Sequence, residues 1–107
     1  MGAVAVTSEQ DVWGASRSFI RRMLDHFIVK VGRKPYLILF KEAFDDGYNS
    51  FSLYDLPHDE YMEFLHLVEE YAKEKELSSN ESEISIADIK LINDLAERMR
   101  KGIHGVT

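Results

Sequence analysis

The chain has 107 residues, of which 45% are hydrophobic, a formal net charge of −6 and no cysteine. This size and composition predict a globular protein with one core, and we expect a single domain over residues 1–107. The lack of cysteine excludes disulfides, cysteine-based zinc sites, iron–sulfur clusters and a thiol nucleophile. No apolar run approaches the ~18 residues of a membrane-spanning helix, so we expect a cytoplasmic protein without membrane contact.

The first predicted element is a long helix over about residues 8–31, preceded by a flexible segment at residues 1–7. Thr7 and Ser8 are both residue types that favour the N-cap position. Thr7 also stands three residues before a glutamine, which is the spacing of a capping box. The sequence therefore predicts that the chain enters this helix near residue 8.

The second half of this helix carries the stronger pattern. From Phe19 onward the apolar residues recur at helical spacing. Gly32 and then Pro35 predict the end of the helix, because glycine favours the position after a helix and proline cannot continue one. One alternative stays open: the β-branched residues within 27–31 favour a strand that would pair with the next element.

A β-hairpin is predicted next. The short apolar run over residues 36–40 favours a buried strand. Residues 48–54 alternate, with Phe51 and Leu53 on one face, as in a strand that is buried on one side. The turn sequence Asp-Asp-Gly at residues 45–47 lies between the two runs, and its glycine can adopt a positive φ. We expect the two strands to pair in antiparallel fashion and to pack on the helices.

Two further helices complete the expected fold. One follows Pro57 and runs to about Leu77, and a polar linker over residues 78–84 comes after it. The last helix begins at the cap Ser85, ends at Gly102 and leaves a flexible tail at residues 103–107. The expected fold class is α+β in the order α-β-β-α-α, with an antiparallel β-hairpin packed against two long amphipathic helices and one shorter C-terminal helix.

Negative charge is concentrated after residue 41. Residues 1–41 carry seven basic and three acidic side chains, whereas the rest of the chain carries six basic and sixteen acidic ones. Several tyrosines stand among these acids, and tyrosine is enriched at protein interfaces. The candidate partner-binding residues are Asp45, Asp46, Tyr48, Tyr54, Asp55, Asp59, Glu63 and Glu70.

The leading hypothesis is a small, non-enzymatic protein-binding module. It would act as an inhibitor, immunity-type or adaptor protein whose acidic, tyrosine-containing surface binds a basic partner protein. Complementary charge would speed the encounter between the two proteins. A homodimer is a further expectation, because a small sheet leaves strand edges to cover.

The alternative is a nucleic-acid-associated regulatory protein that binds through the basic face of the first helix. The acidic composition disfavours nucleic acid as a partner, because contacts with phosphate dominate that kind of affinity. A third possibility is an enzyme or ligand binder with a pocket between the predicted hairpin and the first helix. The residues of the basic face are Arg17, Arg21, Arg22, Arg33 and Lys34.

Metal and catalytic motifs are weak. Glu63 and His66 have the Glu-x-x-His spacing of di-iron bundles, but such bundles need this motif twice together with two further carboxylates. His58 precedes two acids, yet adjacent residues on a helix do not face each other. The sequence therefore predicts no metal, no cofactor and no catalytic residue.

Overall fold

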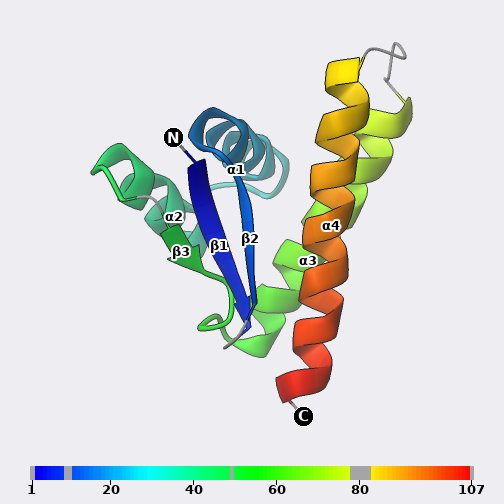
Figure 1. The fold of residues 1–107 in the computed structure, drawn as a ribbon. Helices are drawn as coiled ribbons and strands as arrows, with labels where there is room; N and C mark the ends of the chain where they lie inside the picture. Colours follow the sequence, from blue (N-terminus) through cyan, green and yellow to red (C-terminus); the bar gives the residue numbers. More distant parts are fainter. Residues whose placement is uncertain (1, 9–10, 49, 78–82, 107) are drawn as a thin grey trace. The chain divides into compact units, whose positions relative to one another are not determined.

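The computed structural model describes residues 2–8, 11–48, 50–77 and 83–106, and describes side chains for 11–48, 50–77 and 86–101 (Figure 1). The fold is α+β and dominated by helices, as the sequence predicts. The chain divides into two compact units, Met1–Asp55 and Leu56–Thr107. No helix among the described residues combines the length and the hydropathy needed to cross a membrane.

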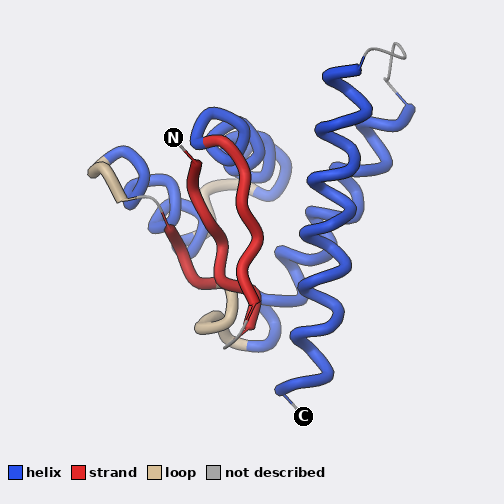
Figure 2. Tube along the Cα trace, in the orientation of Figure 1, coloured by secondary structure: helices blue, strands red, loops and turns tan. Residues whose placement is uncertain are grey.

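The N-terminal unit joins a three-stranded sheet to two helices. Its elements are β1 (Gly2–Ser8), β2 (Asp11–Ser16), α1 (Arg17–Val31), α2 (Pro35–Asp45) and β3 (Ser50–Ser52). Figure 2 shows the three strands side by side, in the order β2-β1-β3. β1 pairs with β2 in antiparallel register and with β3 in parallel register. The central strand is thus β1, so the flexible segment predicted at residues 1–7 is wrong.

The predicted helix over residues 8–31 is wrong in its first half. Residues 11–16 form β2, in which Trp13 is buried while Val12 and Gly14 are exposed, the two-residue period of a strand. The helix begins only at Arg17. Its N-cap is Ser16, whose hydroxyl accepts a hydrogen bond from the Phe19 N–H at 3.2 Å. Because such a cap satisfies a free N–H of the first turn, it fixes the start of α1 here rather than at residue 8.

The end of α1 agrees with the sequence, and the alternative strand at residues 27–31 is excluded. Gly32 has φ +88° and donates its N–H to the Ile28 carbonyl at 2.9 Å. The buried strand predicted over residues 36–40 is wrong, because this run is the first part of α2. Pro35 occupies the first turn of α2, where its missing N–H costs nothing. The buried residues of α2 follow a helical period and are Tyr36, Leu37, Phe40 and Phe44.

The strand predicted over residues 48–54 exists only as β3, at residues 50–52. Phe51 and Leu53 are buried, at 6% and 0% exposure, so the predicted apolar face is confirmed. Its partner differs from the prediction, because β3 pairs in parallel with β1 and no hairpin with residues 36–40 forms. The predicted order α-β-β-α-α is therefore wrong for this unit, whose order is β-β-α-α-β.

The C-terminal unit consists of α3 (His58–Leu77) and α4 (Glu83–Val106), which pack against each other. The predicted limits of α3 are confirmed, and so is its buried stripe. α4 begins before Ser85 and continues past Gly102, so it is the longest helix instead of a shorter one. The predicted linker falls mostly on residues 78–82, which lie outside the described residues. The buried stripe of α3 includes Tyr61, Phe64, Leu65, Val68, Tyr71 and Ala72.

A buried hydrogen bond ties α3 to α4. The Tyr61 hydroxyl donates to the Met99 carbonyl at 2.7 Å. We expect Tyr61→Phe to lower the free energy of unfolding by about 1 kcal/mol, because the carbonyl loses a donor that water does not replace. Urea denaturation followed by circular dichroism measures the loss. Tyr54→Phe is the matched control, since Tyr54 is 39% exposed, and equal stability of the two variants would contradict the assigned role.

Candidate functional site

The loop after α2 has a defined backbone. Gly47 has φ +97° and donates its N–H to the Phe44 carbonyl at 3.0 Å, and the Tyr48 N–H reaches the Ala43 carbonyl at 2.9 Å. These two bonds form a Schellman motif, a common way to end a helix. The turn predicted over residues 45–47 is thus confirmed together with its positive φ, but it ends a helix instead of connecting two strands. We call residues 45–48 the Tyr48 loop.

Arg17, at the start of α1, holds the Tyr48 loop in place. Its Nη1 donates to the Tyr48 carbonyl at 3.0 Å, and its Nη2 donates to the Phe44 carbonyl at 2.5 Å. The guanidinium carbon also lies 5.5 Å from the centre of the Phe44 ring, within the range of a cation–π contact. A cation near the C-terminus of a helix also interacts favourably with the helix dipole. Arg17 therefore fastens α1 to the end of α2.

The Tyr48 side chain remains exposed although the N–H and the carbonyl of its backbone are both hydrogen-bonded. The side chain is 66% exposed, while the N–H and the carbonyl of the same residue bond to Ala43 and Arg17. Asp45 is neutralised by Arg21, whose Nη2 lies 3.1 Å from its Oδ1. The neighbouring Asp46 is exposed and makes no ion pair with any residue that the structure describes. The loop thus presents one aromatic ring beside one uncompensated carboxylate.

The other predicted partner-binding residues fall into two groups. Tyr54 and Asp55 follow β3 and are exposed in the N-terminal unit. The remaining three, Asp59, Glu63 and Glu70, are acids on α3 in the C-terminal unit, where Glu70 Oε1 lies 3.4 Å from His66 Nε2. Three of the eight predicted residues, which are near neighbours in the sequence, belong to the Tyr48 loop. These three are Asp45, Asp46 and Tyr48.

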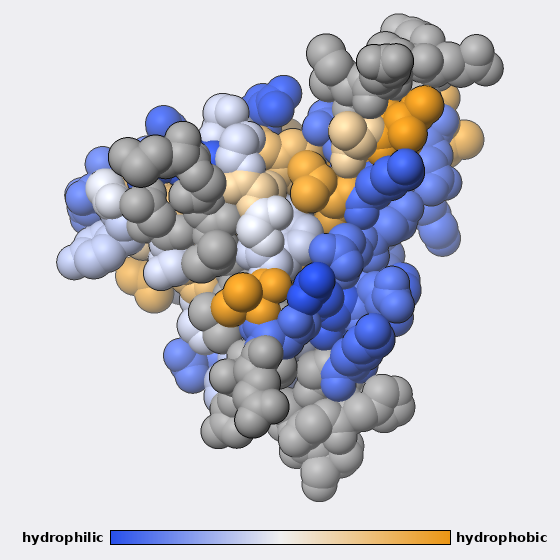
Figure 3. Space-filling model, viewed as in Figure 1, coloured by the Kyte–Doolittle hydropathy of each residue, from blue (hydrophilic) through white to orange (hydrophobic). Residues whose placement is uncertain are grey.

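The surface of the C-terminal unit carries charges of both signs. In the view of Figure 3 most of the coloured surface along α4 is hydrophilic. Arg100 pairs with Glu69 of α3 at 2.7 Å, and Arg98 pairs with Asp94 one turn earlier at 3.0 Å. Such neutralised, exposed pairs add little to stability. They offset only part of the charge, because residues 56–107 carry twelve acidic and six basic side chains and thus the whole net charge of −6.

Some side chains of the predicted basic face form contacts within the protein. Arg17 binds the Tyr48 loop and Arg21 binds Asp45, so both contact α2 or the loop that follows it. A second ion pair between the helices joins Lys41 to Asp25 at 2.5 Å. Of the other three predicted basic residues, Arg22 donates its Nε–H to the Ser18 carbonyl within α1 at 3.3 Å, and the Lys34 carbonyl accepts from the Ile38 N–H of α2 at 3.1 Å. Arg33 lies in the turn that joins α1 to α2.

No protein-family model matches the chain, and neither a curated protein nor a solved structure shows significant similarity to it. Within the part of the chain that the structure describes, no group of three or more His, Asp or Glu side chains could hold a metal ion. The evidence for function is therefore the geometry of the Tyr48 loop.

The sequence did not reveal the role of Arg17. Its two carbonyl partners lie 27 and 31 residues away in the chain. Local spacing assigns it only to a basic helix face, together with Arg21 at i+4. The one local signal was Gly47 at the end of the Asp-Asp-Gly turn, which marks where the loop reverses but not what holds it.

Proposed function

We propose that this protein is a non-enzymatic protein-binding module that recognises a basic partner protein through the Tyr48 loop. The observation that carries the proposal is the exposed Tyr48 ring on a backbone held by Arg17. Tyrosine is among the residue types that contribute most to binding energy at interfaces. A loop that is ordered before binding loses less conformational entropy when the partner docks. An inhibitor, an immunity-type protein and an adaptor all fit this proposal.

Charge supports a basic partner over an acidic one. The support is local, because residues 1–55 carry seven basic and seven acidic side chains, while Asp46, next to Gly47 and Tyr48, makes no ion pair with any described residue. A complementary positive surface on the partner would raise the association rate and make it dependent on salt. The engagement of Arg17 and Arg21 within the N-terminal unit favours this proposal over nucleic-acid binding through α1.

Replacement of Tyr48 tests the proposal. The wild-type protein and Tyr48→Ala are immobilised, and the proteins that each retains from native extract are quantified at low and at high salt. We expect a partner that wild type retains at low salt and that Tyr48→Ala loses. Once the partner is purified, the dissociation constant should rise by about 30-fold, as for a hot-spot residue.

Two further variants sharpen the test. Leu39→Ala is the matched control, because Leu39 is 64% exposed on α2 and lies outside the loop. It should retain the same partner as wild type. Asp46→Asn should weaken binding at low salt and leave it unchanged at high salt. If no retained protein depends on Tyr48, the proposed function is wrong.

A further inference from the structure

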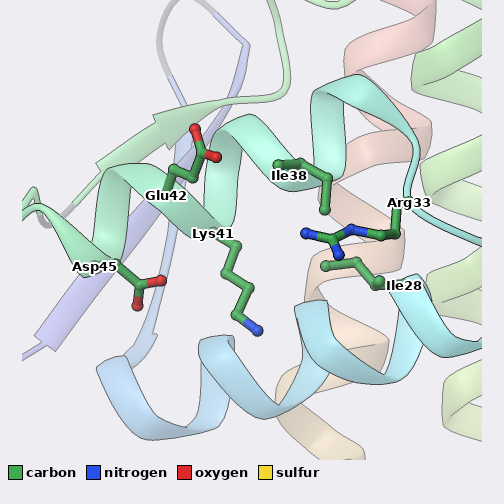
Figure 4. Close-up of a pocket in the computed structure, with 6 residues that line it drawn as sticks. All are labelled: Ile28, Arg33, Ile38, Lys41, Glu42 and Asp45. Atoms are coloured by element: carbon green, nitrogen blue, oxygen red, sulfur yellow. The ribbon is translucent and has the colours of Figure 1, made fainter.

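A pocket of about 400 Å³ lies between α1 and α2 (Figure 4). Its volume is at the lower end of the range found for small-molecule sites. Two isoleucines form apolar walls, and four charged side chains line the rest. The lining residues are Ile28, Arg33, Ile38, Lys41, Glu42 and Asp45.

Most of the charge around this pocket is already compensated. Lys41 pairs with Asp25, and Asp45 pairs with Arg21. In Figure 4 Glu42 points away from the space between the two helices, whereas Arg33 points into it. Arg33 makes no ion pair or hydrogen bond within the described part of the chain. One uncompensated cation therefore faces the pocket.

The surroundings of Arg33 favour an amphipathic ligand. Figure 4 places its guanidinium between the side chains of Ile28 and Ile38, which are both half-buried. A guanidinium binds a carboxylate through two parallel hydrogen bonds, and Arg33 is exposed, so its guanidinium is accessible to a ligand from solvent. An aliphatic chain attached to the carboxylate would cover the two isoleucines and gain by burial.

We propose that this pocket binds a small aliphatic monocarboxylate, with the carboxylate on Arg33 and the chain between Ile28 and Ile38. A single negative charge matches the single free cation. A phosphate dianion would bring a second charge near Asp45 and Glu42, whose repulsion opposes it. The pocket shares Asp45 with the Tyr48 loop, but Tyr48 does not line it and Arg33 lies outside the loop, so this inference does not depend on the proposed function.

Hexanoate is a suitable probe, with hexanamide as its uncharged counterpart. Both are titrated into protein labelled with ¹³C at isoleucine methyl groups. We expect hexanoate to shift the Ile28 and Ile38 signals saturably in the millimolar range, which fits the small number of ligand atoms. Hexanamide should bind about tenfold more weakly, because it cannot form the charge-assisted bonds.

The variant Arg33→Gln should lose hexanoate affinity by about tenfold while hexanamide binding stays unchanged. Arg22→Gln is the matched control, because Arg22 is an exposed arginine of α1 outside the pocket, and it should bind hexanoate like wild type. Circular dichroism verifies that both variants are folded. The absence of a saturable shift, or equal hexanoate affinity of Arg33→Gln and wild type, would overturn the proposal.

Discussion

Replacing Phe51 with alanine is expected to lower the free energy of unfolding of the N-terminal unit by about 3–5 kcal/mol. The Phe51 ring lies 4.5 Å from the Phe40 ring and 5.5 Å from the Phe44 ring, measured between centres. It is 6% exposed, and it connects the short strand β3 to α2. The substitution removes this ring and leaves a cavity between elements that have few other contacts.

The single tryptophan provides the measurement. Trp13 lies in β2 of the same unit and is 1% exposed, so its fluorescence should change when the unit unfolds in urea. Phe51→Leu should cost less than half as much, because leucine fills part of the volume. Tyr54→Ala, an exposed aromatic just after β3, is the control and should change stability little. A loss below about 1 kcal/mol for Phe51→Ala would contradict the packing described here.

Arg17→Ala is expected to cost about 2 kcal/mol, because two carbonyl groups lose a charged donor. The effect should be local as well as global. Hydrogen exchange of the Gly47 and Tyr48 amides should accelerate more than that of amides in α3, because the loop loses its attachment to α1. Exchange rates measured by NMR on wild type and variant test both parts of this expectation.

Arg17→Lys separates charge from geometry. Lysine retains the positive charge near Phe44 and the end of α2, but it lacks the planar fork that reaches two carbonyls at once. It should therefore recover only part of the stability and leave exchange in the Tyr48 loop faster than in wild type. Full recovery by lysine would show that charge alone accounts for the role of Arg17.

These two substitutions also bear on the proposed function. Arg17→Lys leaves the Tyr48 ring intact and loosens only the backbone that presents it. If the order of the loop contributes to affinity, the partner should dissociate faster from Arg17→Lys than from wild type.

The run at residues 36–40 shows why short apolar segments mislead. Five consecutive apolar residues are compatible with a buried strand and with a buried helix. The continuation to Phe44, one turn after Phe40, was a signal for the helix. The position of Pro35 directly before the run was another, because proline favours the first turn. Neither decides the matter without the sheet, whose central position is taken by β1.

The segment before Arg17 shows a different limit. Its strand β2 has only one large buried residue, Trp13, so its two-residue period is faint. Serines suitable for capping stand at both Ser8 and Ser16, and only the pairing of β1 with β2 selects the later one. The boundary between β2 and α1 was therefore decided by tertiary contacts.

The sequence by itself determined the elements whose information is local. Periodicity over five turns predicted α3, and glycine predicted the end of α1 and the positive φ at Gly47. Only the tertiary structure decided which strands pair, and that Arg17 holds the Tyr48 loop. The physical reason is distance along the chain. A helix or cap is stabilised by residues within a few positions of one another. A parallel strand pair, or the contact of Arg17 with the Tyr48 loop, joins residues tens of positions apart, and no local pattern in the sequence indicates the partner.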